Sequence, residues 1–176
     1  MKVFLIRHTE TEQSFKNFIV DDSQDFSLSE KGIGTANKLK FFLDKYKIDN
    51  VYSSPHRRAI QTANLLFPDK EVSVVKNFRE INKGFDKFLQ ENPNLSHMTT
   101  QEWEEEYMCK FADKDRFVKS YPSGESIYDM YQIVNMIFEK ILEKNQNNLA
   151  IIANNGPIKS ILSKFSKQVE KFYFCI

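Results

Sequence analysis

Several features that mark membrane, secreted or zinc-binding proteins are missing from this sequence. It contains two cysteines, Cys109 and Cys175, which lie far apart and indicate neither a disulfide framework nor a cysteine-based zinc site. No apolar run approaches the roughly 18 residues of a membrane-spanning helix. The apolar start of the chain, MKVFLIRHTE, is too short for a secretory signal. We therefore expect a soluble, cytoplasmic protein with no membrane partner.

An excess of charge of either sign is also missing. The chain has 25 Lys and Arg against 24 Asp and Glu, a formal net charge of +1. A dedicated nucleic-acid binder normally carries a basic excess, so we expect no nucleic-acid partner. No glycine-rich phosphate loop is present, so the sequence does not support a nucleotide cofactor, and we expect no cofactor. The content of 41% hydrophobic and 28% charged residues, over 176 residues, fits one globular domain.

The pattern of apolar residues predicts strands that alternate with helices. The predicted strands are residues 2–7, 49–53, 71–76 and 149–153, and the predicted helices are residues 29–46, 56–67, about 125–145 and 156–165. Such alternation is typical of an α/β fold with a mostly parallel sheet. The segment 85–120 is polar and the least regular, and we expect one or two helices there that cover another part of the molecule.

Polar residues follow each predicted strand. They are Arg7-His8, Ser53-Ser54, Arg79-Glu80 and Ala153-Asn154-Asn155. Parallel sheets bind ligands at the carboxyl ends of their strands. Four of the five arginines lie at these ends or in the loops that follow, in a chain that uses lysine for most of its positive charge. Because arginine binds anions through two parallel hydrogen bonds, this placement indicates anion recognition. Ordinary surface arginine is the alternative interpretation, above all for Arg57 and Arg79.

Two of these residues have the chemistry of a catalyst. His8 ends a buried strand beside Arg7, and a neighbouring cation lowers the pKa of an imidazole, which favours a neutral nucleophile. Glu80 follows the third strand, where a carboxyl group is able to protonate a leaving oxygen. A structural histidine and a solvated glutamate are the alternatives. His56 precedes the arginine pair, and we expect it at the rim of a pocket.

Six segments along the chain match one known family in order and spacing. They are RHTET (7–11), SLSEKG (27–32), SSPHRRAIQTA (53–63), REINKG (79–84), YPSGES (121–126) and IIANNGPIKSIL (151–162). Together they resemble the histidine phosphatase superfamily, also called the phosphoglycerate mutase-like family, over nearly the whole chain. The resemblance implies a three-layer αβα sandwich around a mostly parallel sheet. It also implies a single domain over 1–176, with a lid-like insertion at about 85–120.

The resemblance also implies roles for individual residues. His8 matches the nucleophile that becomes a phosphohistidine, and Glu80 matches the general acid. Arg7 and Arg58 match the arginines that bind the phosphoryl group. The expected partner is a small phosphorylated substrate or phosphate itself, and no metal is required. Further residues expected to line the pocket are Thr9, Thr11, His56 and Asn155.

The sequence departs from the family pattern at three places. Asn154 stands where the family has a second catalytic histidine. Its amide can donate a hydrogen bond to phosphate but carries no positive charge, so we expect a loss of about 10²–10³ in rate. Thr9 stands where the family has glycine, and its side chain is expected to crowd the phosphate. The chain stops at FYFCI, where the family continues into another strand, and a short final strand there leaves an edge able to pair with a second copy.

Two functions of different classes follow from these observations. The first is a slow phosphatase that hydrolyses a small phosphomonoester through a phosphohistidine, because Arg7, His8, Arg58 and Glu80 are all present. The alternative is a catalytically degenerate module that binds phosphate or a phosphoprotein, because of Asn154. A third interpretation, a generic doubly wound binding domain, explains less of the sequence.

Overall fold

The computed structural model describes residues 1–12, 25–82, 90–91, 93, 124–165 and 172–175. The strands are β1 (Val3–Arg7), β2 (Asn50–Ser53), β3 (Val72–Val74), β4 (Leu149–Ala153) and β5 (Phe172–Cys175). The helices are α1 (Glu30–Leu43), α2 (Arg57–Leu66), the 3-10 helix η2 (Lys76–Phe78), α6 (Ile127–Lys144) and α7 (Asn155–Phe165). The predicted alternation of strands and helices is therefore confirmed. The expected lid at 85–120 lies outside the described residues, apart from residues 90, 91 and 93.

The five strands form one sheet in the order β3-β2-β4-β1-β5. The pairings β3·β2, β2·β4, β4·β1 and β1·β5 are all parallel, as the mostly parallel prediction requires. The strand predicted over 71–76 is shorter, because the chain turns into η2 after Val74. The short final strand expected at FYFCI is present, because FYFC forms β5, which pairs with β1 at the edge of the sheet.

Side-chain caps begin two of the long helices. The Ser29 hydroxyl accepts a hydrogen bond from the Gly32 N–H at the start of α1. Ser126 and Asp129 form a reciprocal capping box at the start of α6. Helix α1 ends at Leu43, earlier than the predicted residue 46. Tyr46 lies in the turn after the helix and packs on Phe4 with the ring centroids 5.0 Å apart, so its apolar contact does not require a longer helix.

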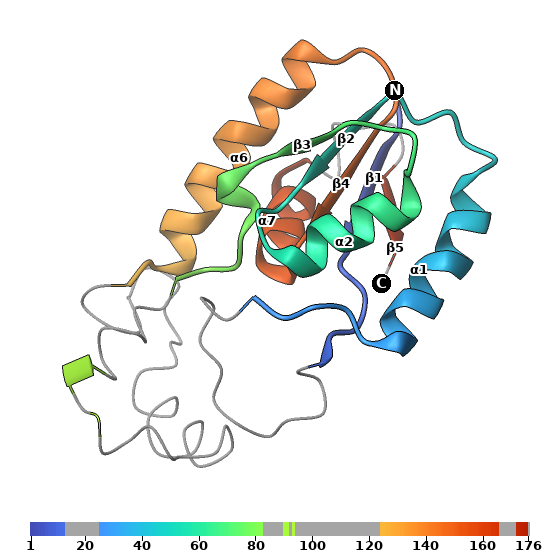
Figure 1. Ribbon diagram of the computed structural model, residues 1–176. Helices are drawn as coiled ribbons and strands as arrows, with labels where there is room; N and C mark the ends of the chain where they lie inside the picture. The colour runs from blue at the N-terminus through green and yellow to red at the C-terminus, as the bar shows by residue number, and fades with distance from the viewer. Residues whose placement is uncertain (13–24, 83–89, 92, 94–123, 166–171, 176) are drawn as a thin grey trace.

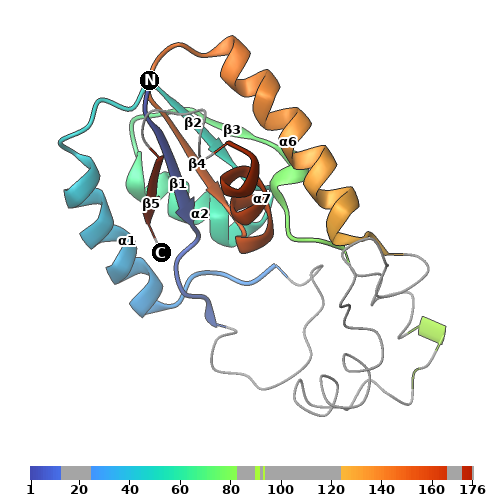
Figure 2. The same cartoon turned by 180° about the vertical axis from the view of Figure 1, so that it is seen from behind.

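Strands β1 and β4 are buried on both faces, between helices that form the two outer layers (Figure 1). Along β1, Phe4 and Ile6 face a core shared with α1 and α2, whereas Val3 and Leu5 face a core shared with α6 and α7. Every residue of β4 is buried, as expected for a central strand. Figure 2 shows α6 and α7 from the other side of the sheet. The predicted αβα sandwich is therefore confirmed.

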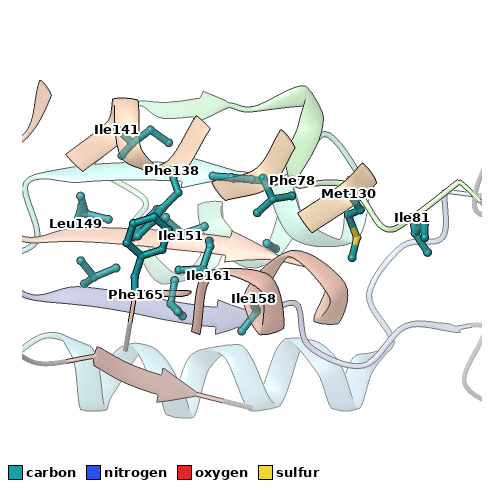
Figure 3. Packing of buried hydrophobic residues seen from close by; sticks show 14 residues of the cluster. Phe78, Ile81, Met130, Phe138, Ile141, Leu149, Ile151, Ile158, Ile161 and Phe165 are labelled. Atoms are coloured by element: carbon teal, nitrogen blue, oxygen red, sulfur yellow. The ribbon is translucent and has the colours of Figure 1, made fainter. Parts of the chain in front are cut away.

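The core beneath α6 and α7 extends to the carboxyl end of the sheet. Figure 3 shows Phe138 and Phe165 in its middle and Met130 and Ile81 toward the end to which β1 points. The Phe138 and Phe165 rings meet edge to face with centroids 5.0 Å apart. Among the described residues, no helix combines the length and the hydropathy that a membrane crossing needs. The apolar packing thus provides a rigid base for the residues that follow the strands.

Candidate active site

The residues after β1, β2 and β4 lie side by side, because these strands are parallel neighbours. The His8 N–H donates to the Ala153 carbonyl at 3.3 Å, and the Ser54 N–H donates to the Ile152 carbonyl at 2.8 Å. The ladder of the sheet thus continues one residue past each strand. The structure therefore brings together strand-end residues that are about 100 and 145 positions apart in the sequence.

His8 is held in one tautomer by its own loop. Its Nδ1 lies 2.9 Å from the Thr9 carbonyl oxygen, which only accepts, so Nδ1 carries the hydrogen and Nε2 carries the lone pair. Burial lowers the pKa of His8 against the opposing effect of this hydrogen bond, and the charges of Arg58, Arg7 and His56 also lower it, to about 4 in total. His8 is therefore a neutral imidazole near pH 7, with an unprotonated Nε2.

Arg58 is a buried cation in the first turn of α2. It is 9% exposed, its Nη2 lies 3.0 Å from His56 Nδ1, and its Nη1 lies 3.9 Å from the Asp25 carboxylate. The same carboxylate accepts from the Arg57 N–H at 2.6 and 2.7 Å at the start of the helix. Arg7, by contrast, is exposed at the end of β1, near enough to His8 to lower its pKa. Both arginines expected to bind phosphate therefore lie beside His8.

Asn154 and His56 are in contact behind Arg58. Asn154 is 3% exposed, and its Oδ1 lies 3.2 Å from His56 Nδ1 and 3.4 Å from Ser54 Oγ. Burial and the charge of Arg58 lower the pKa of His56, against the opposing effects of Asn154, Asp25 and Glu80. His56 is thus part of this cluster rather than only of the pocket rim.

Glu80 is fixed from the opposite side of the sheet end. Its Oε2 accepts from the Gly156 N–H at 3.3 Å, and its Oε1 accepts from the Ile81 N–H at 3.3 Å. A Cβ atom on Gly156 would lie 2.2 Å from Oε1, so the carboxylate occupies the space that a side chain would fill. The glycine at the start of α7 is therefore what allows Glu80 to approach.

Arg79 braces this loop through contacts with Glu125 and the Glu80 backbone. Its Nη2 pairs with Glu125 Oε1 at 2.5 Å, and its Nη1 donates to the Glu80 carbonyl at 2.8 Å. The other oxygen of Glu125 accepts from the Asn82 N–H at 3.0 Å. The half-buried, ion-paired Arg79 thus differs from the ordinary surface arginine that was the alternative interpretation.

The remaining predicted pocket residues make contacts in the loops and helix ends around the site. Thr9 is buried, and its N–H donates to Thr62 Oγ1 at 3.2 Å. Thr11 is buried and forms an isolated antiparallel bridge with Leu28. Asn155 is the half-buried first residue of α7. Because Thr62 lies in α2, the hydrogen bond of Thr9 ties the loop after β1 to that helix.

Three residues to which the sequence alone assigned no role in the site take part in this cluster. Asp25 contacts Arg57 and Arg58, Ser54 contacts Asn154, and Gly156 contacts Glu80. Ser54 and Gly156 had a local signal, because Ser54 directly follows a predicted strand and Gly156 begins a predicted helix. Within the described part of the chain, no group of three or more His, Cys, Asp or Glu side chains is placed to hold a metal ion.

Comparison with known proteins identifies the family of this chain. The family described as the histidine phosphatase superfamily (branch 1) matches residues 3–175. The human 6-phosphofructo-2-kinase/fructose-2,6-bisphosphatase 4 is 29% identical over 167 residues, which are 93% of this chain and 32% of that protein. The chain therefore spans about a third of the length of the curated relatives it matches.

Solved structures of known proteins have the same fold as this chain. The phosphoserine phosphatase of Entamoeba histolytica, solved with 3-phosphoglyceric acid, is 25% identical with a TM-score of 0.72, covering 92% of this chain and 79% of that one. The phosphoglycerate mutase of Bacillus anthracis, at 20% identity and a TM-score of 0.68, covers 97% and 82% and shows the same fold. The match over almost every residue shows that the chain belongs to the histidine phosphatase superfamily, branch 1.

Proposed function

We propose that this protein hydrolyses a small phosphomonoester through a phosphohistidine on His8. The observation that carries the proposal is the state of His8, a neutral imidazole with Nδ1–H bound to the Thr9 carbonyl and the lone pair on Nε2. Arg58 and Arg7 lie beside it to neutralise the phosphoryl oxygens, and Glu80 is held at the same edge of the sheet. The likeness to a phosphoserine phosphatase supports a small phosphomonoester as substrate.

The reaction has two balanced steps. His8 Nε2 attacks phosphorus, the bond from phosphorus to the ester oxygen breaks, and protonated Glu80 gives its proton to the leaving alcohol. Water then attacks the phosphohistidine and passes a proton to the Glu80 carboxylate, while the N–P bond breaks. Inorganic phosphate leaves, and both residues return to their starting state.

Asn154 is expected to lower the rate of phosphate release. A neutral amide at this place stabilises the charge of the transferring group less than a cation does. We expect turnover to be lower by about 10²–10³ than with a charged group there, the size of effect seen when one oxyanion donor is removed.

The test is hydrolysis of an aryl phosphate across pH 5–8, with His8→Ala made in parallel. We expect turnover in the parent and none in the variant, together with an acid-labile, base-stable phosphate label on the parent alone. Turnover that persists in His8→Ala would overturn the proposed nucleophile. Absence of both turnover and label in the parent would overturn the phosphatase proposal.

Asn154 also supports a second candidate, a module that binds phosphate or a phosphoprotein without turnover. This candidate predicts that the parent binds inorganic phosphate but releases none from a panel of monoesters. Asn154→His should then produce turnover. If turnover does not rise in this variant, the amide is not what limits the site.

A further inference from the structure

The imidazole of His56 joins two elements of the site through a single nitrogen atom. Nδ1 lies 3.0 Å from Arg58 Nη2 on α2 and 3.2 Å from Asn154 Oδ1 after β4. The backbone N–H of His56 also donates to Ser54 Oγ at 3.3 Å. The ring therefore lies between the guanidinium and the end of the central strand.

The identity of the Arg58 group decides the tautomer of His56. A guanidinium only donates, so Nδ1 must accept and the ring hydrogen must be on Nε2. Asn154 Oδ1, which accepts from Ser54 Oγ, faces the same nitrogen, and a half-turn of the planar amide would present its NH2 group there instead as a second donor. The lowered pKa of His56 agrees with this neutral state. His56 and His8 therefore carry their ring hydrogens on opposite nitrogens.

Two acceptors hold the two ends of the Arg58 guanidinium. Asp25 lies 3.9 Å from Nη1, and His56 holds Nη2. The charged and titratable groups that act on His56 are Arg58 on α2, Asp25, Glu80 and His8 after β1. Without the imidazole, we expect the Asp25 carboxylate to draw the guanidinium toward itself and away from His8.

We propose that His56 is the positioning residue of Arg58, whose guanidinium it directs at the phosphoryl group through the acceptor Nδ1. The inference rests on the proposed function, because Arg58 is there the buried phosphate-binding arginine. His56 acts through Arg58, so its loss affects anion affinity first. Its Nε2–H plays no part in this effect.

Three variants separate the two ring nitrogens. Asparagine places an amide oxygen near the position of Nδ1, glutamine reaches the position of Nε2, and leucine replaces neither. We expect His56→Leu to raise KM for an aryl phosphate and to weaken inorganic phosphate binding by about 10- to 100-fold, as expected for losing one hydrogen bond to a charged group. His56→Asn should keep most of the affinity, and His56→Gln should behave like the leucine variant.

A double-mutant cycle with Arg58→Ala tests whether His56 acts through the arginine. We expect His56→Leu to have no further effect on phosphate affinity in the Arg58→Ala background. Nitrogen-15 NMR of the parent at pH 7 should show His56 with the hydrogen on Nε2. Circular dichroism of each variant checks that it is folded.

Four results would overturn the inference. They are an unchanged affinity in His56→Leu, rescue by glutamine but not by asparagine, an equal loss in the Arg58→Ala background, and a hydrogen on His56 Nδ1. A parent that binds phosphate without turnover or label would overturn only the phosphatase proposal, and the affinity series would still decide the role of His56. A parent that binds no phosphate would overturn both.

Discussion

The contact between Gly156 and Glu80 allows a test of the proposed general acid by a mutation outside it. In Gly156→Ala, the new Cβ would lie 2.2 Å from Glu80 Oε1 and 2.9 Å from Met130 Sδ. The carboxylate must therefore retreat by about 1 Å, a displacement that costs on the order of 10²-fold when it misplaces a catalytic group. Because both crowded atoms are the ends of flexible side chains, we expect the free energy of unfolding to stay within about 1 kcal/mol of the parent.

The choice of leaving group shows whether Gly156→Ala impairs general-acid catalysis. A general acid contributes about 10²–10⁴ in rate, mostly for alcohols that leave poorly without a proton. We expect kcat/KM of Gly156→Ala to fall by about 10² with an alkyl phosphate and by much less with a nitrophenyl phosphate. Glu80→Gln should show the same dependence on the leaving group, and the loss in Gly156→Ala should not exceed its loss.

The matched control is Gly34→Ala in α1, where a Cβ meets nothing within 4 Å. We expect this variant to keep full activity and to gain roughly 0.5–1 kcal/mol in stability, because alanine favours the helix. Equal activity of the two alanine variants would refute the reasoning. An equal loss with both substrates in Gly156→Ala would refute the assignment of Glu80 as the acid.

Three further predictions follow from other contacts. By proton NMR, His8 should titrate at about pH 4, and Arg58→Leu should raise this pKa, because it removes a positive charge that disfavours the imidazolium; a drop in the variant would contradict the electrostatic account. Unfolded His8 binds a proton below about pH 6.5, whereas folded His8 binds one only near pH 4, so its contribution to stability should fall as pH drops through that window. Chemical denaturation should therefore show a smaller change of the free energy of unfolding with pH in His8→Ala than in the parent. Gly32→Ala should destabilise by about 1–3 kcal/mol in the same assay, because its Cβ would lie 2.0 Å from the Glu10 carbonyl oxygen, a backbone atom that cannot turn away; stability equal to that of Gly34→Ala would contradict this.

The sequence predicted the architecture well because its signals are local. Apolar runs such as LAIIA and the spacing of apolar residues over 125–145 correspond to β4 and α6. The prediction erred where a residue reached the core from outside an element. Tyr46 extended the apparent period of α1, and the run 71–76 includes residues that turn into η2.

The candidate site was predicted in part for a similar reason. His8, Arg58 and Asn154 follow strands or begin a helix, so the alternation of elements places them at one edge of the sheet. Arg79 has the same local signal, yet it pairs with Glu125, which comes from the far end of the intervening segment. A strand-end arginine therefore predicts position but not partner.

The sequence by itself determined the fold class, which polar residues follow each strand, and the chemical types of those residues. Only the tertiary structure decided which nitrogen of His8 carries the hydrogen, that His56 joins Arg58 to Asn154, and that Gly156 makes room for Glu80. The physical reason is that strand and helix periods depend on neighbouring residues. The last two contacts join segments 98 and 76 positions apart, and their geometry exists only once the parallel register and the helix placement are set.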